Sequence, residues 1–291
     1  MTKGRFAPSP TGVLHLGNLR TALAAWGSAR AGGGSFIIRF EDLDRITSSG
    51  DHALRQAEDL SAIGIRSDEI PVYQSTRFDL YHSAINSLTE RGLTYECYCS
   101  RKEVAEAAAA PHGVMALYAG TCRDLTEAER AERRAVRPPA LRLRSGDVQC
   151  SFFDALHGSV SDVSGDVVLR RNDGVPSYHV AVVVDDAAQG ITEVVRGDDL
   201  LMATPAQVLL QQFLELPTPT YAHVPLVLGA DAERLAKRHT AITLYELEQQ
   251  GMTPEEVRDM LWASLGQTSD VFNWNAVPRE PWVAPLTHGK S

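Results

Sequence analysis

The stretch "RFAPSPTGVLHLGNLRTALAAW", residues 5–26, determines which fold class the chain is expected to adopt. Residues 5–7 predict a short buried strand, and the prolines at 8 and 10 end it because proline cannot continue a strand ladder. Apolar residues at helical spacing follow over 14–31, and "GGG" at 32–34 closes this helix. A strand that turns directly into a helix predicts the first unit of an α/β fold.

The same alternation continues to residue 91. "SFIIRFED" at 35–42 predicts a second strand, and amphipathic helices are expected over 51–63, with Asp51 as the N-cap, and over 75–91. Strand, helix, strand, helix in this order is typical of a parallel sheet covered by helices. We therefore predict an α/β, Rossmann-like nucleotide-binding fold with a parallel sheet.

The alternation stops between residues 97 and 165, which we interpret as an inserted lobe that splits this fold. The range contains all four cysteines, an alanine-rich stretch and an Arg/Glu-rich helix over 126–136. Beyond it the α/β pattern is expected to resume, with strands at 166–171, 178–186, 191–197 and 223–229 and a helix at 200–215. The predicted parts are the first half of the catalytic domain (1–96), the inserted lobe (97–165), the second half (166–240) and a short helical end with a tail (241–291).

Composition places the chain among acidic globular proteins. Of its 291 residues 44% are hydrophobic, and the formal net charge is −9, so nucleic acid would have to meet a local basic patch. No signal-peptide pattern is present, and no apolar run approaches the ~20 residues that span a bilayer. We therefore expect a cytoplasmic protein with no membrane partner, in which clustered cysteines hold metal more often than they form disulfides.

The beginning of the first helix has the features of a phosphate site. A helix N-terminus attracts phosphate through its unpaired N–H groups and its dipole. Thr11 and Gly12 let the backbone come close to a ligand, and His15 and Asn18 add side-chain donors. A capped helix with a satisfied histidine is the simpler interpretation, but the preceding strand and P-x-P-T-G favour the phosphate site. The sequence contains neither G-x-x-x-x-G-K-[ST] nor G-x-G-x-x-G.

A second cluster of cations occurs late in the chain, in "ERLAKRHTA" at 233–241. Arg234, Lys237 and Arg238 place three positive charges within five residues. A solvated basic turn is the simpler interpretation. However, Lys237 is one of four lysines in a chain that otherwise uses arginine, which indicates a need for a compact ammonium group.

Together these motifs resemble the two signatures of class I aminoacyl-tRNA synthetases. More narrowly, "RFAPSPTGVLHLG", "RFEDLD" (39–44), "SYHVAVVVDD" (177–186) and "EVVRGDDLL" (193–201) resemble the glutamyl-tRNA synthetase family, in the same order. The chain departs from the family signatures in two places. The first signature ends in Asn18 instead of histidine, and the second has Arg234 and Ala236 instead of lysine and serine. Asn18 can still donate a hydrogen bond, whereas Ala236 removes a hydroxyl group and Lys237 keeps the charge.

The resemblance implies an enzyme that activates L-glutamate with ATP and Mg²⁺. Full-length members carry a large helical anticodon-binding region, whereas fewer than fifty residues follow residue 245 here. A truncated branch of the family has this architecture, activates glutamate without tRNA and transfers it to the queuosine base in the anticodon of tRNA(Asp). We predict that function for a monomeric chain whose partners are ATP, L-glutamate and tRNA(Asp). The alternatives are an ordinary glutamyl-tRNA synthetase without its anticodon domain, a small-molecule adenylyltransferase and a non-catalytic paralogue that acts as a binding module.

The resemblance also assigns the site residues. A free glutamate has two carboxylates and one ammonium group, so its pocket needs two arginines and an acid. The implied glutamate-binding residues are Arg5, Phe6, Ala7, Pro8, Ser9, Glu41, Tyr178 and Arg196. The implied ATP-binding residues are His15, Gly17, Asn18 and Lys237. Of these, His15 and Lys237 are assigned catalytic roles, because they would hold the triphosphate and neutralise the leaving pyrophosphate.

The cysteines predict a zinc site in the inserted lobe. Cys97 and Cys99 alternate onto one face of a predicted strand, so both sulfurs can reach one ion. The resemblance implies that Cys97, Cys99, Tyr118 and Cys122 bind one structural Zn²⁺ ion. His112 and Cys150 are chemically suitable alternatives for the fourth ligand, and small buried cysteines without metal are the simpler interpretation.

The helix predicted over 126–136 is the candidate surface for tRNA because it is the most basic segment. Its arginines, with the one that follows it, are Arg130, Arg133, Arg134 and Arg137. Three glutamates alternate with them, so a solvated helix with internal ion pairs is an equal alternative.

Overall fold

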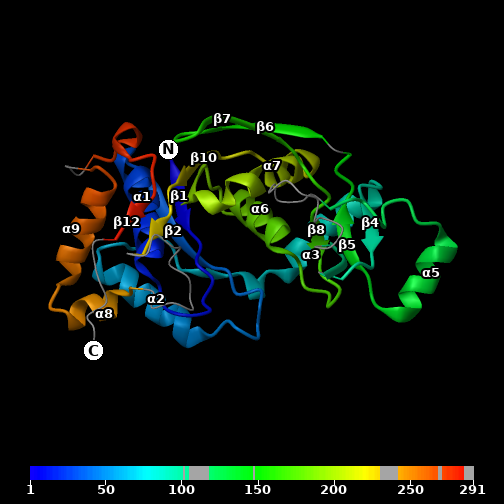
Figure 1. Cartoon of the computed structure of the whole chain (residues 1–291), viewed down its shortest axis with the longest axis horizontal. Coiled ribbons are helices and arrows are strands. Elements are labelled where there is room, and N and C mark those ends of the chain that lie inside the picture. The colour runs from blue at the N-terminus through cyan, green and yellow to red at the C-terminus, as the bar shows by residue number, and fades with distance from the viewer. Residues whose placement is uncertain (101, 105–117, 147, 230–241, 268–270, 285–291) are drawn as a thin grey trace.

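We describe the fold from a computed structural model, which describes residues 1–100, 102–104, 118–146, 148–229, 242–267 and 271–284 (Figure 1). The late cation cluster at 233–241 and the alternative zinc ligand His112 lie outside these ranges. From left to right in Figure 1, the molecule passes from a parallel sheet with its helices, through a central helical layer, to a small antiparallel sheet.

The first sheet is parallel, as predicted. It consists of β1 (Lys3–Phe6), β2 (Ser35–Phe40) and β3 (Val72–Tyr73) in that order. α1 (Leu16–Ala31) and α2 (Gly50–Ala62) connect these strands, and the 3₁₀ helix η1 (Gln74–Thr76) and α3 (Phe78–Glu90) follow β3. The alternation of strands and helices predicted for the first 91 residues is therefore confirmed.

A second sheet lies beside the first. Its order is β7–β6–β10–β9, made of β6 (Gln149–Asp154), β7 (Gly158–Val163), β9 (Glu193–Gly197) and β10 (Thr220–Val224). The backbone N–H of Thr192 donates to the carbonyl oxygen of Lys3 over 3.0 Å, which holds β9 next to β1. The strand order therefore reverses between β1 and β9. Ligands of open α/β folds bind at the carboxyl ends of the strands at such a switch point.

The segment 178–186 is a helix, so the strand predicted there is wrong. It forms most of α6 (Tyr178–Ala188), in the middle of the molecule between the two ends seen in Figure 1. All seven residues from Val180 to Asp186 are buried. This stretch of α6 therefore has no solvent-exposed face, and its sequence lacks the alternation of polar and apolar residues that marks a surface helix. Its run of valines then has the composition of a buried strand.

The helix starts are set by side-chain caps. The hydroxyl of Ser49 accepts from the N–H of His52 over 3.1 Å, so Ser49 rather than the predicted Asp51 is the N-cap of α2. Asp51 lies in the first turn, where its negative charge interacts favourably with the positive end of the helix dipole. Capping boxes at Thr243 and Thr253 begin α8 (Leu244–Gln249) and α9 (Pro254–Ser264), which form the predicted short helical end.

A small antiparallel sheet forms the opposite end of the molecule. It contains β4 (Thr94–Cys97), β5 (Ala140–Leu143) and β8 (Val168–Arg170), and α5 (Glu127–Val136) extends beyond it at the right of Figure 1. β8 falls in 166–171, where a strand of the resumed α/β pattern was predicted, so the strand itself is present. It pairs antiparallel with β5, and the identity of such a distant partner strand is not encoded in a local run.

The hairpin of β6 and β7 belongs to the second sheet by its hydrogen bonds. β6 pairs parallel with β10, and Asp154 lies opposite Tyr221. Its residues nevertheless fall within 97–165, the range that the sequence assigns to the inserted lobe. The domain bounds themselves stay a prediction.

The remaining predicted elements are present in a divided form. The helix expected at 200–215 is the 3₁₀ helix η2 (Asp198–Ala203) followed by α7 (Thr204–Phe213). The strand expected at 223–229 is the end of β10 and the short β11 (Val227–Leu228), which pairs with β12 (Trp282–Val283). Pro225 separates the two because it lacks the N–H that a ladder requires.

The C-terminal end packs closely on α1. A methyl group at Gly27 would lie 2.5 Å from the ring of Trp262 in α9, so glycine is required for this contact. In the part of the chain that the structure describes, no helix has both the length and the apolar character needed to cross a membrane.

Candidate active site

A cavity of about 600 Å³ opens at the switch point between β1 and β9. It lies where β1, β2 and β9 end, because its lining includes the residues directly after β1 and β2 and the last residues of β9. The predicted site residues in its lining are Arg5, Phe6, Ala7, Pro8, Ser9, His15, Gly17, Asn18, Glu41, Tyr178 and Arg196. The structure therefore brings together every predicted glutamate- and ATP-binding residue that it describes, and Lys237 lies outside the described residues.

A buried charge network holds the end of β1. Arg5 donates from Nε and Nη2 to the two carboxylate oxygens of Asp186 in α6, over 3.2 and 3.4 Å. Arg39 is fully buried and donates to the same carboxylate over 2.8 Å. Burial favours the neutral form of Asp186, but the two arginines hold its pKa below the ordinary value. α6 thus positions Arg5, which lines the cavity, by ionic hydrogen bonds from Asp186.

The negative charge of Glu41 is less well balanced by nearby cations than that of Asp186. It follows β2, and its closest charge partner is Arg39, whose Nη2 lies 3.5 Å from Oε1. Burial raises the pKa of Glu41 to about 7, although Arg39 and Arg5 act in the opposite direction. An ammonium group in the cavity would supply the positive charge that this carboxylate lacks.

The guanidinium of Arg196 has partners on one side only. Its Nε lies 3.0 Å from Nε2 of His223, and its Nη2 donates to the hydroxyl of Thr204 over 2.6 Å. Nη1 is buried and has no hydrogen-bond partner among the described residues. A buried N–H pair without an acceptor is costly, so this edge of Arg196 is suited to an anionic ligand in the cavity that it lines.

The N-terminus of α1 is closed by a reciprocal cap. Nδ1 of His15 accepts from the N–H of Asn18 over 3.3 Å, and Oδ1 of Asn18 accepts from the N–H of His15 over 3.1 Å. In the neutral ring the proton then sits on Nε2. A methyl group at Gly17 would lie 3.0 Å from the imidazole, so only glycine leaves this ring in place. The cap is therefore observed and Asn18 takes part in it, whereas the phosphate site predicted at this helix N-terminus stays a prediction.

The loop before α1 is held from α2. The buried amide of Gln56 donates to the carbonyl oxygens of Ser9 and Gly12, over 3.1 and 2.7 Å. The chain after the late cation cluster is fixed to the same place, because the N–H of Leu16 donates to the oxygen of Ile242 over 2.8 Å. The segment that follows the late cation cluster therefore contacts the N-terminus of α1, whereas the cluster itself lies outside the described residues.

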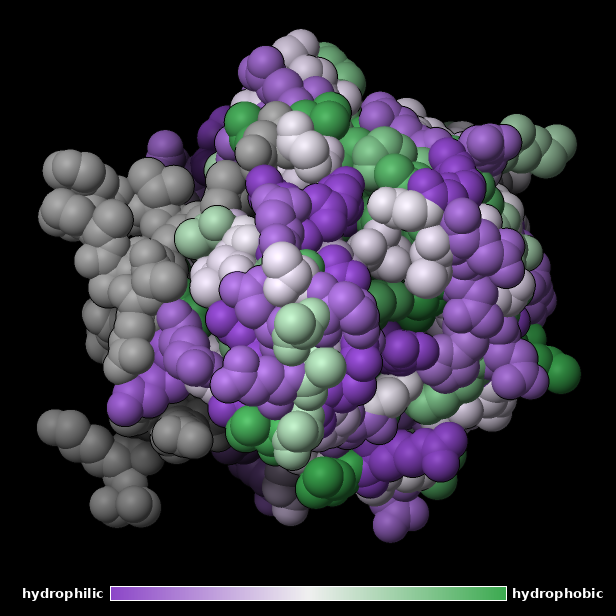
Figure 2. Space-filling model, turned by 90° about the vertical axis from the view of Figure 1, so that its right-hand side faces the viewer, coloured by the Kyte–Doolittle hydropathy of each residue, from purple (hydrophilic) through white to green (hydrophobic). Residues whose placement is uncertain are grey.

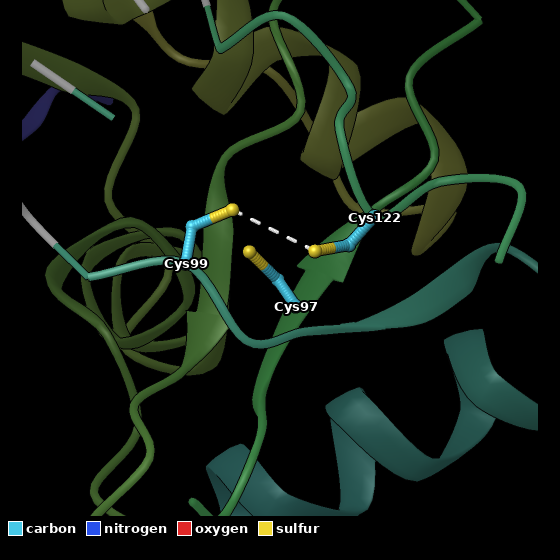
Figure 3. Close-up of side chains that lie close together, drawn as sticks. All are labelled: Cys97, Cys99 and Cys122. Atoms are coloured by element: carbon cyan, nitrogen blue, oxygen red, sulfur yellow. Dashed lines mark hydrogen bonds between the residues drawn. The ribbon is translucent and has the colours of Figure 1, made fainter. Parts of the chain in front are cut away.

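The three predicted thiol ligands converge in the antiparallel lobe (Figure 3). The sulfurs of Cys97, Cys99 and Cys122 all lie within 4.8 Å of one another, and those of Cys99 and Cys122 are 3.6 Å apart. A tetrahedral zinc ion with Zn–S bonds of about 2.3 Å separates its sulfurs by roughly 3.8 Å. The geometry therefore fits one zinc ion, although Cys99 lies beyond the end of β4 instead of on the predicted strand.

Tyr118 lies beside the thiols, as the fourth predicted ligand. Its hydroxyl oxygen is 3.4 Å from the sulfur of Cys97 and 3.5 Å from that of Cys99. The guanidinium of Arg142 lies over its ring at 3.9 Å, and Nη1 of Arg133 lies 3.6 Å from the sulfur of Cys122. Cys150 packs in a different hydrophobic cluster, so the structure does not support it as the alternative ligand.

The basic helix α5 is laced with ion pairs. Arg134 contacts Glu96 at 2.6 Å and Glu127 at 3.5 Å, and Arg137 contacts Glu103 at 3.6 Å. The surface at this end of the molecule is largely hydrophilic (Figure 2). The ion-paired alternative is thus observed, and it weakens α5 as a tRNA surface.

Sequence reasoning missed several groups of the site. Thr21 and Asp199 line the cavity, and Arg39 and Asp186 hold Arg5 beneath it. A signal was present for Asp186, because two adjacent acids end an otherwise apolar run at 178–186. No local signal connects His223 to Arg196, since the contact joins two different strands.

Comparison with known proteins agrees with this geometry. The family model "tRNA synthetases class I (E and Q), catalytic domain" matches residues 1–270. The chain is 54% identical over 288 residues to the glutamyl-Q tRNA(Asp) synthetase of Nocardia farcinica, covering 96% of this chain and 92% of that protein. It is 41% identical over 274 residues to the glutamate–tRNA ligase of Nitrosospira multiformis, covering 91% of this chain but 57% of that protein.

A solved structure gives the same result. The glutamate tRNA ligase from Elizabethkingia meningosepticum, in complex with its amino acid, matches with a TM-score of 0.80 and 27% identity. The match covers 97% of this chain and 66% of that chain. The longer ligases thus extend well beyond the match, whereas the Nocardia protein and this chain match over nearly their whole lengths.

Proposed function

Because the chain belongs to the family of class I tRNA synthetases for glutamate and glutamine, we propose that it activates L-glutamate with ATP, without tRNA, and transfers it to queuosine in the anticodon of tRNA(Asp). The observation that carries the proposal is the cavity at the switch point, where Arg5, Arg196 and Glu41 supply two cations and one acid. This set complements the two carboxylates and the ammonium group of free glutamate. The name of the 54% identical Nocardia protein supports the acceptor.

The first step requires positioning and charge neutralisation from the protein. The α-carboxylate of glutamate attacks the α-phosphorus of ATP in line, and pyrophosphate leaves, so no protein nucleophile is involved. Glu41 holds the ammonium group, and Arg196 pairs with a carboxylate through Nη1, for which the described residues offer no acceptor. His15 and the N-terminus of α1 hold the triphosphate, with Mg²⁺ on its oxygens, and Lys237 neutralises charge on the leaving pyrophosphate.

The second step is attack of a queuosine hydroxyl on the carbonyl carbon of the adenylate, with AMP as the leaving group. Because α5 is ion-paired, we propose that the RNA meets the surface around the cavity instead. ATP, glutamate and tRNA are cytoplasmic substrates, so we propose that the protein acts in the cytoplasm, and we propose that it does so as a monomer.

We further propose one structural Zn²⁺ ion per chain, held by Cys97, Cys99, Cys122 and Tyr118. Bound zinc would cross-link the end of β4 to the segment before α5, where the described residues form only a small cluster of their own. The nearby Arg133 and Arg142 offset the negative charge of this ligand set.

Two assays test the function. ATP–pyrophosphate exchange with glutamate should proceed equally with and without tRNA. If no amino acid supports any exchange, the catalytic proposal is overturned in favour of a binding module. Labelled glutamate should then join tRNA(Asp) that contains queuosine and lacks its 3′-terminal adenosine. Charging that requires this adenosine, or that is equal on tRNA without queuosine, would show an ordinary glutamyl-tRNA synthetase.

A further inference from the structure

Arg196 is held by a chain of buried polar groups that begins on the neighbouring strands. The chain runs from Asp154 at the end of β6, through His223 in β10, to Arg196 in β9, and Thr204 closes it from α7. Arg196 is 6% exposed, and the other three residues are fully buried. We propose that Asp154 and His223 are positioning residues that orient Arg196 and make its site selective for a carboxylate over a carboxamide, an inference that rests on the proposed function.

Asp154 is fixed as an ionised acceptor. Its Oδ1 accepts from the N–H groups of Leu156 and His157, over 2.9 and 3.0 Å. Its Oδ2 accepts from the backbone N–H of His223 over 3.0 Å and lies 2.6 Å from Nδ1 of the same residue. Four donors surround one carboxylate, which leaves no position for a proton on it.

His223 must then present a lone pair to Arg196. The proton of the neutral ring lies on Nδ1, because Nδ1 faces the carboxylate of Asp154. Nε2 is therefore an acceptor, and it lies 3.0 Å from Nε of Arg196, which can only donate. Burial lowers the pKa of His223 even though Asp154 acts in the opposite direction, which agrees with a neutral ring.

Two of the three nitrogens of Arg196 have an acceptor among the described residues. His223 accepts from Nε of Arg196, and the hydroxyl of Thr204 accepts from Nη2 while it donates to the oxygen of Leu200. Among the described residues nothing accepts from Nη1, so its N–H groups are available to a ligand. Both oxygens of a carboxylate can accept from this arginine, whereas a carboxamide has one accepting oxygen and a second group, NH₂, that is itself a donor. The buried hydrogen bonds therefore fix the orientation of the Arg196 guanidinium, so that Nη1 presents its two N–H donors in one direction.

Two substitutions of one residue test this reasoning. In His223→Gln the side-chain oxygen can occupy the place of Nε2, which restores an acceptor for Arg196. In His223→Asn the shorter amide replaces Nδ1 and keeps the donor to Asp154, but nothing accepts from Arg196. Pyrophosphate exchange measures the KM values for glutamate and ATP and the ratio of kcat/KM for glutamate to that for glutamine.

We expect His223→Asn to raise the KM for glutamate by roughly tenfold or more and to lower the glutamate-to-glutamine ratio, with the KM for ATP within about twofold of wild type. His223→Gln should recover most of the loss. The control Tyr221→Phe removes a buried hydroxyl that accepts a hydrogen bond from Gln211, but it keeps the ring. It should leave the KM for glutamate and the glutamate-to-glutamine ratio unchanged. Thr204→Val removes the hydroxyl that accepts from Nη2 of Arg196 and that also lies 3.1 Å from Nε2 of His223. It should act like His223→Asn and supplies the test if the asparagine variant does not fold.

Each outcome decides the matter. If Arg196→Ala raises the KM for glutamate while folded His223→Asn or Thr204→Val matches wild type, the positioning role is wrong and the proposed function stands. Equal losses in His223→Gln and His223→Asn would also overturn it, because they would indicate a merely structural histidine. Wild-type protein that exchanges no pyrophosphate with glutamate would overturn the proposed function, and this inference with it.

Discussion

Replacing Glu41 by glutamine should make the ligand-free protein more stable at neutral pH while removing its use of glutamate. The side chain of Glu41 is 11% exposed, and it has an ion pair to Arg39 at 3.5 Å without a hydrogen bond. Burial raises its pKa to about 7 from an ordinary value of 4.5. The folded protein therefore keeps, at neutral pH, a carboxylate that the unfolded chain would solvate better.

The magnitude follows from the pKa difference. One pKa unit corresponds to about 1.4 kcal/mol, so the ionised Glu41 lowers the free energy of unfolding by roughly 3 kcal/mol above pH 7. The folded state holds its proton more tightly, so this group's contribution is most favourable below pH 4.5 and is lost as the pH rises through 7. The advantage of Glu41→Gln over wild type should therefore grow by roughly 2–3 kcal/mol between pH 5 and pH 8.

The same pKa sets a pH dependence of glutamate use. Only the ionised form of Glu41 attracts the ammonium group of the substrate. With a pKa of about 7, the wild-type KM for glutamate should be about tenfold higher at pH 6 than at pH 8. Glu41→Gln should have a high KM at both pH values.

Denaturant unfolding of both proteins at pH 5 and pH 8, without ligand, measures the first effect, and pyrophosphate exchange measures the second. Glu58→Gln, at an exposed glutamate on α2, is the matched control and should change neither. A stability difference between wild type and Glu41→Gln that is the same at the two pH values would refute the reasoning, as would a glutamine variant that is less stable at pH 8.

Three further outcomes are expected. Lys237→Ala should lower the rate of pyrophosphate exchange by roughly 10²-fold with little change in glutamate binding, since its charge partner develops only as pyrophosphate leaves; a rate within threefold of wild type would contradict the assignment. Metal analysis should find one zinc per chain, lost in Cys122→Ser and kept in Cys150→Ser, whose thiol packs in another cluster; zinc absent from the wild type would remove the claim. Gly27→Ala should lower the free energy of unfolding by about 1–3 kcal/mol, because its methyl group meets a tryptophan ring at 2.5 Å, whereas Gly50→Ala, with nothing within 4 Å, should not.

The sequence was most informative where local chemistry decides the structure. Proline and glycine punctuation located β1 and α1, and the motifs around them placed Arg5, His15 and Glu41 at one cavity. Those residues lie next to strand ends or at a helix N-terminus. Their positions follow from short stretches of chain that each carry their own signal.

The sequence was least informative where distant segments meet. The apolar run of α6 has no amphipathic period because packing surrounds it, so strand and helix could not be separated there. The partner of β8 and the support of Arg196 by His223 are contacts across the fold. Nothing in the residues around 223 indicates which arginine the histidine will face.

The path of the chain through the antiparallel lobe limits how this protein can be divided. The chain enters the lobe at β4 and leaves it after β5 to form β6 and β7 of the second sheet. It then returns to the lobe for β8 before it reaches α6. Leu141, Leu143 and Leu169 of the lobe also share a hydrophobic cluster with α3, α6 and α7. Excision of residues 97–165 would remove β6 and β7 from the second sheet and would remove β5, the strand with which β8 pairs. We therefore expect the lobe and the catalytic body to unfold in one cooperative transition, and a genetic fusion or split of the protein to succeed only outside residues 94–170.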